Sequence, residues 1–191
     1  DSNMHTQGGG NFIGLKNFID LFKDEVFLDA LWNTFVIVFV SVPAVTAFSL
    51  WVSSAIYKLK MPVLSAFRCI FYLPVVTGSV AVTVVWKWIF DNYTGILNSV
   101  LKTTGTIDAN INWLGDEKYA LWCIILILFT TSVGQPIVLY VSALGNVDAS
   151  LVEAAQVDGA TDLQAFWKIK WPQIMPTTLY ILVITTINSF Q

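Results

Sequence analysis

The sequence carries little charge. Only 12% of its 191 residues are Asp, Glu, Lys or Arg, whereas a soluble domain carries about 25%. Hydrophobic residues make up 55% of the chain, a composition typical of a protein embedded in a bilayer. The net charge of −3 provides no basic surface, which excludes nucleic acid as the expected partner.

Cysteine and histidine are equally scarce. Cys69 and Cys123 both fall inside apolar runs, so we expect buried small side chains and no disulfide. The single histidine, His5, lies in a polar leader. With one histidine and no cysteine cluster, the sequence predicts neither a metal site nor a membrane-embedded enzyme with a polar catalytic cluster. A glycine-rich GK[ST] loop is also missing, so the chain is not expected to bind ATP.

The charged residues leave four long intervals between them. Residues 30–57, 69–86, 119–147 and 171–191 contain no Asp, Glu, Lys or Arg. A spanning helix needs about 20 apolar residues, which three intervals exceed and the 18 residues of 69–86 barely approach. We therefore expect an all-α polytopic membrane protein with about four spanning helices.

Four spans of alternating direction would place segments 58–68 and 148–170 on one side of the membrane. That side would hold five basic residues: Lys58, Lys60, Arg68, Lys168 and Lys170. Short loops rich in Lys and Arg face the cytoplasm, so this side is expected to be cytoplasmic. Residues 1–29 are then an extracytoplasmic segment, and residues 30–191 form the transmembrane domain.

Proline, glycine and polar side chains interrupt the apolar runs. The stretch LPVVTGS, residues 73–79, is an example, and broken helices of this kind often line a translocation path. The alternatives are an ordinary kink packed against a neighbour, amides that bond across helices, and an interfacial aromatic belt. The candidate path residues are Pro74, Thr77, Gly78, Trp86, Gln135 and Asn188.

A compact polar segment, residues 148–170, separates the last two apolar intervals. Ser150 and Glu153 fit a capping box, which predicts a short helix through Val157. Gly159 is placed to end that helix, because glycine adopts left-handed backbone at low cost. Capping alone would explain Glu153, and a DNA-binding helix-turn-helix is excluded by the acidic charge and the flanking apolar intervals.

A second helix is expected to follow the glycine turn. Thr161 and Gln164 fit another capping box, and Pro172 marks the start of the last apolar interval. Four residues at helical spacing are expected to share one face: Leu163, Phe166, Trp167 and Lys170. The small residues before this helix would give a smooth surface that suits close docking against another protein.

The segment EAAQVDGA, residues 153–160, resembles the EAA signature of permease subunits of binding-protein-dependent ABC importers. KIKWPQIMPT, residues 168–177, resembles the continuation of that signature, with Trp171 where leucine is usual. Four further stretches resemble permeases of the carbohydrate branch, the maltose and glycerol-phosphate type: GLKNFIDLF at 14–22, FRCIFYLPVV at 67–76, VVWKWIFDNYTGILN at 84–98 and INWLGDEKYAL at 111–121.

The resemblance implies a type I ABC importer transmembrane domain, with further helices before and after this chain. The EAA loop would be a cytoplasmic coupling helix, formed by Glu153, Ala154, Ala155, Gln156, Asp158, Gly159 and Ala160. Implied partners are a second permease subunit, a pair of ATPase subunits that bind ATP and Mg²⁺, an extracytoplasmic solute-binding protein, a sugar and the bilayer. The chain itself would bind no cofactor and would lie in a bacterial cell membrane.

The main alternative is an ion-coupled secondary transporter or a channel subunit. Such proteins usually bury functional carboxylates, lysines or arginines within their spans. The four apolar intervals contain none, which favours the importer. The sequence does not identify the sugar.

Overall fold

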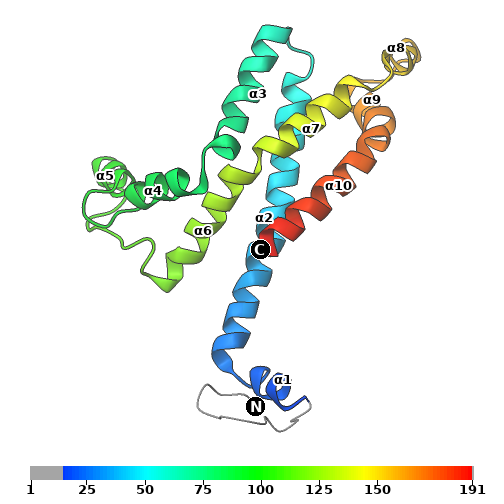
Figure 1. The fold of residues 1–191 in the computed structure, drawn as a ribbon. Helices are drawn as coiled ribbons and strands as arrows, with labels where there is room; N and C mark the ends of the chain where they lie inside the picture. The colour runs from blue at the N-terminus through cyan, green and yellow to red at the C-terminus, as the bar shows by residue number, and fades with distance from the viewer. Residues whose placement is uncertain (1–14, 191) are drawn as a thin grey trace. The chain divides into compact units, whose positions relative to one another are not determined.

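The computed structural model describes residues 15–190, and every regular element in that range is helical (Figure 1). The helices are α1 (Lys16–Leu21), α2 (Glu25–Ile56), α3 (Met61–Val76), α4 (Ser79–Ile89), α5 (Ile96–Thr103), α6 (Glu117–Ser132), α7 (Gly134–Gly145), α8 (Ala149–Val157), α9 (Asp162–Ala165), the π-helix η1 (Phe166–Lys170) and α10 (Trp171–Phe190). The all-α prediction is confirmed.

The chain divides into two compact units, residues 1–36 and 37–191. The described part of the first unit holds α1 and the beginning of α2. The second unit holds the rest of α2 and all later helices, and it contains every site considered below. His5 lies outside the described residues.

Only α2, with 32 residues, is by itself long and apolar enough to cross a membrane among the described helices. Two helix pairs become long enough if each bent pair is counted as one span, α3 with α4 (bent by 95°) and α6 with α7 (bent by 42°). Length and composition thus give one to three candidate spans, against the four expected. The fourth interval does form a helix, α10 of 20 residues, but prolines, threonines and amides dilute its apolar character.

The sharp bend between α3 and α4 follows from the LPVVTGS stretch. Pro74 has no N–H to donate to the carbonyl four residues earlier, so the last turn of α3 is weakened. Thr77 and Gly78 then adopt extended backbone, with ψ of 123° and 143°. The Leu73 carbonyl at the helix end accepts both the Thr77 N–H at 3.0 Å and the Thr77 hydroxyl at 2.8 Å.

The bend between α6 and α7 brings two backbones together. A Cβ atom at Gly134 would lie 2.3 Å from the carbonyl oxygen of Phe71 in α3, so only glycine permits this approach. Two serines of α2 fasten the same region: Ser49 donates to the Val133 carbonyl at 3.4 Å, and Ser53 donates to the Ile137 carbonyl at 3.0 Å. Side chains of this kind support broken helices in apolar surroundings.

Helix α7 is central to the second unit. One apolar cluster joins it to α2 and α3 through residues such as Val45, Leu64 and Ile137. A second cluster joins it to α10 through Tyr140 and Ile181 among others. Figure 1 shows α7 crossing between α3 and α10, which fits this double role.

The cysteine prediction holds for one residue of the two. Cys123 of α6 is buried, but Cys69 of α3 is exposed, and both are free thiols. Phe67 and Ile70, which are neighbours of Cys69 in α3, are also exposed. Position in an apolar run therefore does not predict that a side chain is buried inside this chain. In a membrane protein an apolar side chain can be covered by lipid or by another subunit instead.

Residues 91–113, which we call the α5 lobe, are organised around one buried amide. The Asn98 Nδ2 atom donates to the carbonyls of Asp91, Asn92 and Ile111 at 3.0–3.3 Å. Its Oδ1 atom accepts from the Ile111 N–H at 3.2 Å and from Trp113 Nε1 at 2.9 Å. Asn98 is 2% exposed, so its side chain replaces a hydrophobic core for this lobe.

Replacing Asn98 with leucine should therefore destabilise the α5 lobe. The change leaves partly buried N–H and C=O groups unpaired, each at a cost of up to about 1–3 kcal/mol. The purified Asn98→Leu protein should unfold at a lower temperature. The control is Asn112→Leu, which should change the unfolding temperature little, because the Asn112 side chain accepts a hydrogen bond only from Gly115 of its own turn among the described residues. Equal effects of the two substitutions would contradict the central role of Asn98.

Candidate functional site

The polar segment 148–170, which we call the cassette, begins with a short helix. Asp148 caps α8, because its carboxylate accepts the Ser150 N–H at 2.9 Å. The predicted cap at Ser150 is wrong: Ser150 lies inside the helix, since an aspartate two residues earlier was available to start it. The Ser150 hydroxyl, and then its N–H, hold the pKa of Asp148 below its usual value, so the cap stays charged near neutral pH and weakens only as pH falls.

The glycine turn of the cassette is confirmed. Gly159 has φ of +85°, and a Cβ atom there would meet nothing within 4 Å, so the requirement for glycine is conformational. The Gly159 N–H donates to the Gln156 carbonyl at 3.0 Å, and the Ala160 N–H donates to the Ala155 carbonyl at 2.9 Å. These two bonds form a Schellman motif that ends α8 and turns the chain back.

The second capping box is also confirmed. The Gln164 N–H donates to Thr161 Oγ1 at 3.3 Å, and the Thr161 N–H donates to Gln164 Oε1 at 2.9 Å. The two helices of the cassette are tied together by Gln156, whose Nε2 atom donates to Asp162 Oδ1 at 3.0 Å. The cassette is thus a self-bonded helix, turn and helix.

The second helix runs on without a break into α10 through a π-turn, η1. The Trp171 N–H bonds to the Phe166 carbonyl, five residues earlier, and the wider turn relieves the clash that Pro172 would cause in a regular helix. This turn also changes the angular spacing, so the predicted single face is wrong. Leu163 and Trp167 are exposed, whereas Lys170 is buried.

Trp171, the departure from the leucine of the EAA continuation, has a packing role. Its side chain packs against the apolar cluster that joins α7 and α10. The ring also lies 5.4 Å from the ring of Trp167. A larger apolar side chain thus fills this junction between the cassette and α10.

The cassette lies at the same end of the second unit as the turn between α2 and α3 (Figure 1). Lys170 Nζ donates to the Tyr57 hydroxyl at 2.8 Å, and its ammonium lies 5.4 Å from the centroid of the Tyr57 ring. This contact joins residues 113 positions apart. It connects the cassette directly to the end of α2.

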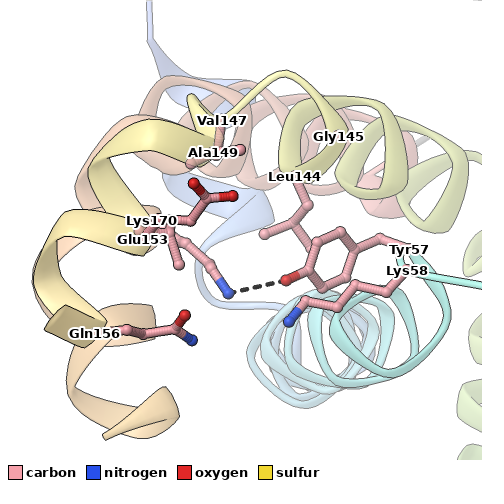
Figure 2. Close-up of a pocket in the computed structure, with 10 residues that line it drawn as sticks. Tyr57, Lys58, Leu144, Gly145, Val147, Ala149, Glu153, Gln156 and Lys170 are labelled. Carbon is pink, nitrogen blue, oxygen red and sulfur yellow. Dashed lines mark hydrogen bonds between the residues drawn. The ribbon is translucent and has the colours of Figure 1, made fainter. Parts of the chain in front are cut away.

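A cavity of about 390 Å³ opens between the cassette and the ends of α2 and α7. Figure 2 shows Tyr57 and Lys58 on one wall and Glu153 and Gln156 on the α8 wall, with Lys170 reaching between them. We call it the cassette cavity. Two of the predicted coupling residues, Glu153 and Gln156, thus line a shared space.

Most of the predicted coupling residues are exposed, although Glu153 and Gln156 also line the cassette cavity. Five are exposed: Glu153, Ala154, Gln156, Asp158 and Gly159. Ala155 and Ala160 are half-buried. Beside them Val157 is 88% exposed and Leu163 is 69% exposed, which adds apolar area to a surface of small residues. Such a mixture at a tight turn is typical of a protein docking site.

Three of the predicted path residues line a second cavity, at the bend between α3 and α4. The cavity has a volume of about 250 Å³, and Pro74, Thr77 and Trp86 contribute to its wall together with Thr130 and Thr131 of α6. Gly78 lies in the bend but does not line the cavity. The wall is mainly apolar, with the threonine side chains as its polar elements.

The two predicted amides line a third cavity, of about 160 Å³, between α6, α7 and α10. Gln135 and Asn188 are both exposed there, and neither side chain has a hydrogen-bond partner within residues 15–190. Thr131 lines this cavity as well as the second one, so the two adjoin. Five of the six predicted path residues therefore lie along two neighbouring cavities.

Three site residues escaped sequence reasoning for different reasons. Asp148 carries a usable signal, since aspartate is a preferred N-cap residue and Asp148 stands two residues before Ser150. Thr131 is one of several hydroxyl residues in an apolar run, and nothing local distinguishes it. Tyr57 meets Lys170 only through the tertiary fold, so no spacing in the sequence indicates the pair.

Residues 18–191 match the protein family described as "Binding-protein-dependent transport system inner membrane component". The chain is similar to the probable ABC transporter permease protein YesP of Bacillus subtilis, with 37% identity over 94% of this chain and 58% of that protein. It is also similar to the lactose transport system permease protein LacF of Rhizobium radiobacter, with 31% identity over 94% of this chain and 60% of that protein. The chain thus spans about three-fifths of the length of these relatives.

A solved structure has a similar fold. It is a bacterial ABC transporter involved in the import of the acidic polysaccharide alginate, with a TM-score of 0.78 and 28% identity over 91% of this chain and 60% of that chain. The same kind of transporter in complex with an alginate pentasaccharide-bound periplasmic protein gives a TM-score of 0.77. These likenesses confirm the predicted fold class, the transmembrane domain of an ABC importer.

Proposed function

Because the chain belongs to the family of inner membrane components of binding-protein-dependent transport systems, we propose that it is part of a permease subunit of an ATP-driven carbohydrate importer. The sugar class is supported by relatives whose names refer to lactose and arabinooligosaccharides, and by the alginate importer of similar fold. The observation that carries the proposal is the cassette, a capped helix pair with an exposed turn at Gly159.

In this proposal the cassette is the coupling element. Its exposed turn and small side chains dock on a cytoplasmic ATPase subunit, which binds ATP and Mg²⁺ and carries out hydrolysis. Movement of the cassette reaches the membrane helices through two routes, the continuous helix from η1 into α10 and the contact of Lys170 with Tyr57. Rigid elements of this kind transmit a docking movement as a rearrangement of packed helices.

The expected assembly follows from the family. A second permease subunit, a pair of ATPase subunits and an extracytoplasmic solute-binding protein complete the importer. The protein resides in a bacterial cell membrane with the cassette on the cytoplasmic side, because the short segment 58–68 beside the cassette carries three basic residues and no acidic one. The cavities at the α3–α4 bend and between α7 and α10 form part of the sugar path, with Thr77, Gln135 and Asn188 as polar groups facing it.

The proposal is tested by affinity purification of the full-length protein from detergent, followed by mass spectrometry. We expect recovery of an ATPase with a P-loop and of a second, similar permease. Recovery of the protein alone, or as a homo-oligomer, would favour the ion-coupled secondary transporter instead. Uptake by proteoliposomes provides the second readout, since the importer requires ATP and a secondary transporter requires only an ion gradient.

A further inference from the structure

Two ammonium groups converge on one aromatic ring in the cassette cavity. Lys170 Nζ lies 5.4 Å from the centroid of the Tyr57 ring, and Lys58 Nζ lies 5.8 Å from it. Lys170 is 6% exposed, and within residues 15–190 its ammonium forms one hydrogen bond, to the Tyr57 hydroxyl. An ammonium group has three donors, so two donors of Lys170 are available for another acceptor.

Neither lysine forms an ion pair within residues 15–190. A buried ammonium is costly unless an anion or several hydrogen bonds compensate for the lost hydration. The cavity of about 390 Å³ lies directly beside both lysines and has the size of a small-molecule site. This wall of the cavity therefore favours an anion.

The opposite wall has a different chemistry. Glu153 and Gln156 extend from α8 into the same space (Figure 2). The Glu153 carboxylate accepts hydrogen bonds. Gln156 keeps its Oε1 acceptor and one N–H of Nε2 besides the bond to Asp162, so together the two side chains suit hydroxyl groups and not a second anion. A ligand that satisfies both walls carries a phosphate at one end and hydroxyls at the other.

We propose that the cassette cavity binds a polyol phosphate, with the phosphate between Lys58 and Lys170 and the hydroxyls against Glu153 and Gln156. This chemistry has two sources, the glycerophosphate headgroup of an anionic phospholipid and a free polyol phosphate. Basic pockets between membrane helices at the cytoplasmic surface commonly hold lipid headgroups. The inference goes beyond the proposed importer function, because binding here is independent of what is transported. A bound ligand would tie the cassette to α2 and so modulate its movement.

The test is calorimetric titration of the intact purified complex in an uncharged detergent. One series uses glycerol 2-phosphate and the other uses dihexanoyl-phosphatidylglycerol. Tighter binding of the lipid assigns the cavity to the membrane, and equal or weaker binding of the lipid assigns it to a free polyol phosphate. Inorganic phosphate, which has no polyol group, measures the contribution of Glu153 and Gln156. We expect it to bind more weakly than glycerol 2-phosphate.

The variants locate the site. Lys170→Met should weaken binding by about tenfold or more, because it removes a charge-assisted hydrogen bond. Lys168→Met is the matched control, since Lys168 lies on the same turn but is exposed and does not line the cavity. Lys58→Gln removes the second ammonium and should also weaken binding. Because Lys58 is less buried than Lys170, this variant tests the proposal even if Lys170→Met does not fold. Equal affinity in all variants, or an equal loss in Lys168→Met, would overturn the proposal.

Discussion

Replacing Gly159 with glutamate is expected to leave the protein inserted in the membrane but to weaken its hold on the ATPase subunit by about tenfold or more, which corresponds to about 1.4 kcal/mol. Two effects combine. A residue other than glycine at φ of +85° is strained by about 1–2 kcal/mol, and a bulky charge then projects from the exposed turn that docks. The measurement is the amount of ATPase subunit that co-purifies with the variant from detergent.

The matched control is Gly105→Glu. Gly105 has φ of +71° and, like Gly159, has open space where a Cβ atom would lie, but it belongs to the turn after α5. The backbone strain is therefore similar, whereas the position is outside the cassette. Normal co-purification of the ATPase with Gly159→Glu, or an equal loss with Gly105→Glu, would contradict the assignment of the cassette turn as the docking point.

Replacing Gly134 with alanine is expected to lower the free energy of unfolding by about 1–3 kcal/mol, the usual cost of overpacking. The new Cβ would lie 2.3 Å from the Phe71 carbonyl oxygen and 2.9 Å from Val75 Cγ2. Because backbone atoms are involved, α3 and α7 must move apart, which disturbs the bend that shapes two cavities. Thermal unfolding in detergent measures the loss.

Gly145→Ala serves as the control at the other end of the same helix. Nothing lies within 4 Å of a Cβ atom at Gly145, so this substitution should leave the unfolding temperature unchanged. If Gly134→Ala were as stable as Gly145→Ala, the close approach of α3 and α7 would have no energetic importance.

The parts of the cassette that form through short-range hydrogen bonds could be predicted from the sequence. The Thr161–Gln164 capping box and the turn at Gly159 involve residues within a few positions of one another, so the sequence contains the whole interaction. The cap of α8 was misplaced because Asp148 and Ser150 are both good N-cap residues and only the backbone path decides between them. The π-turn at η1 widens the helix just before Pro172, and a helical period of 3.6 residues does not predict such a local change of spacing.

The larger arrangement was predictable only in outline. Charge-free intervals located the apolar segments, but not the 95° and 42° bends, which depend on Pro74 and on the approach of Gly134 to α3. The contact between Tyr57 and Lys170 joins residues 113 positions apart, and one sequence gives no sign of it. The path residues share cavities that form only when α3, α6, α7 and α10 are brought together.

The central claim is that the cassette docks on an ATPase subunit, and site-directed crosslinking tests it most directly. A cysteine replaces Val157, which is 88% exposed at the end of α8, in full-length protein from which Cys69 and Cys123 have been removed. A cysteine at Val100 of the α5 lobe, 51% exposed, is the control. We predict that the Val157→Cys variant crosslinks to the ATPase subunit of the intact complex and that Val100→Cys does not. An intact complex in which Val157→Cys forms no crosslink, or in which Val100→Cys forms it instead, would contradict the account.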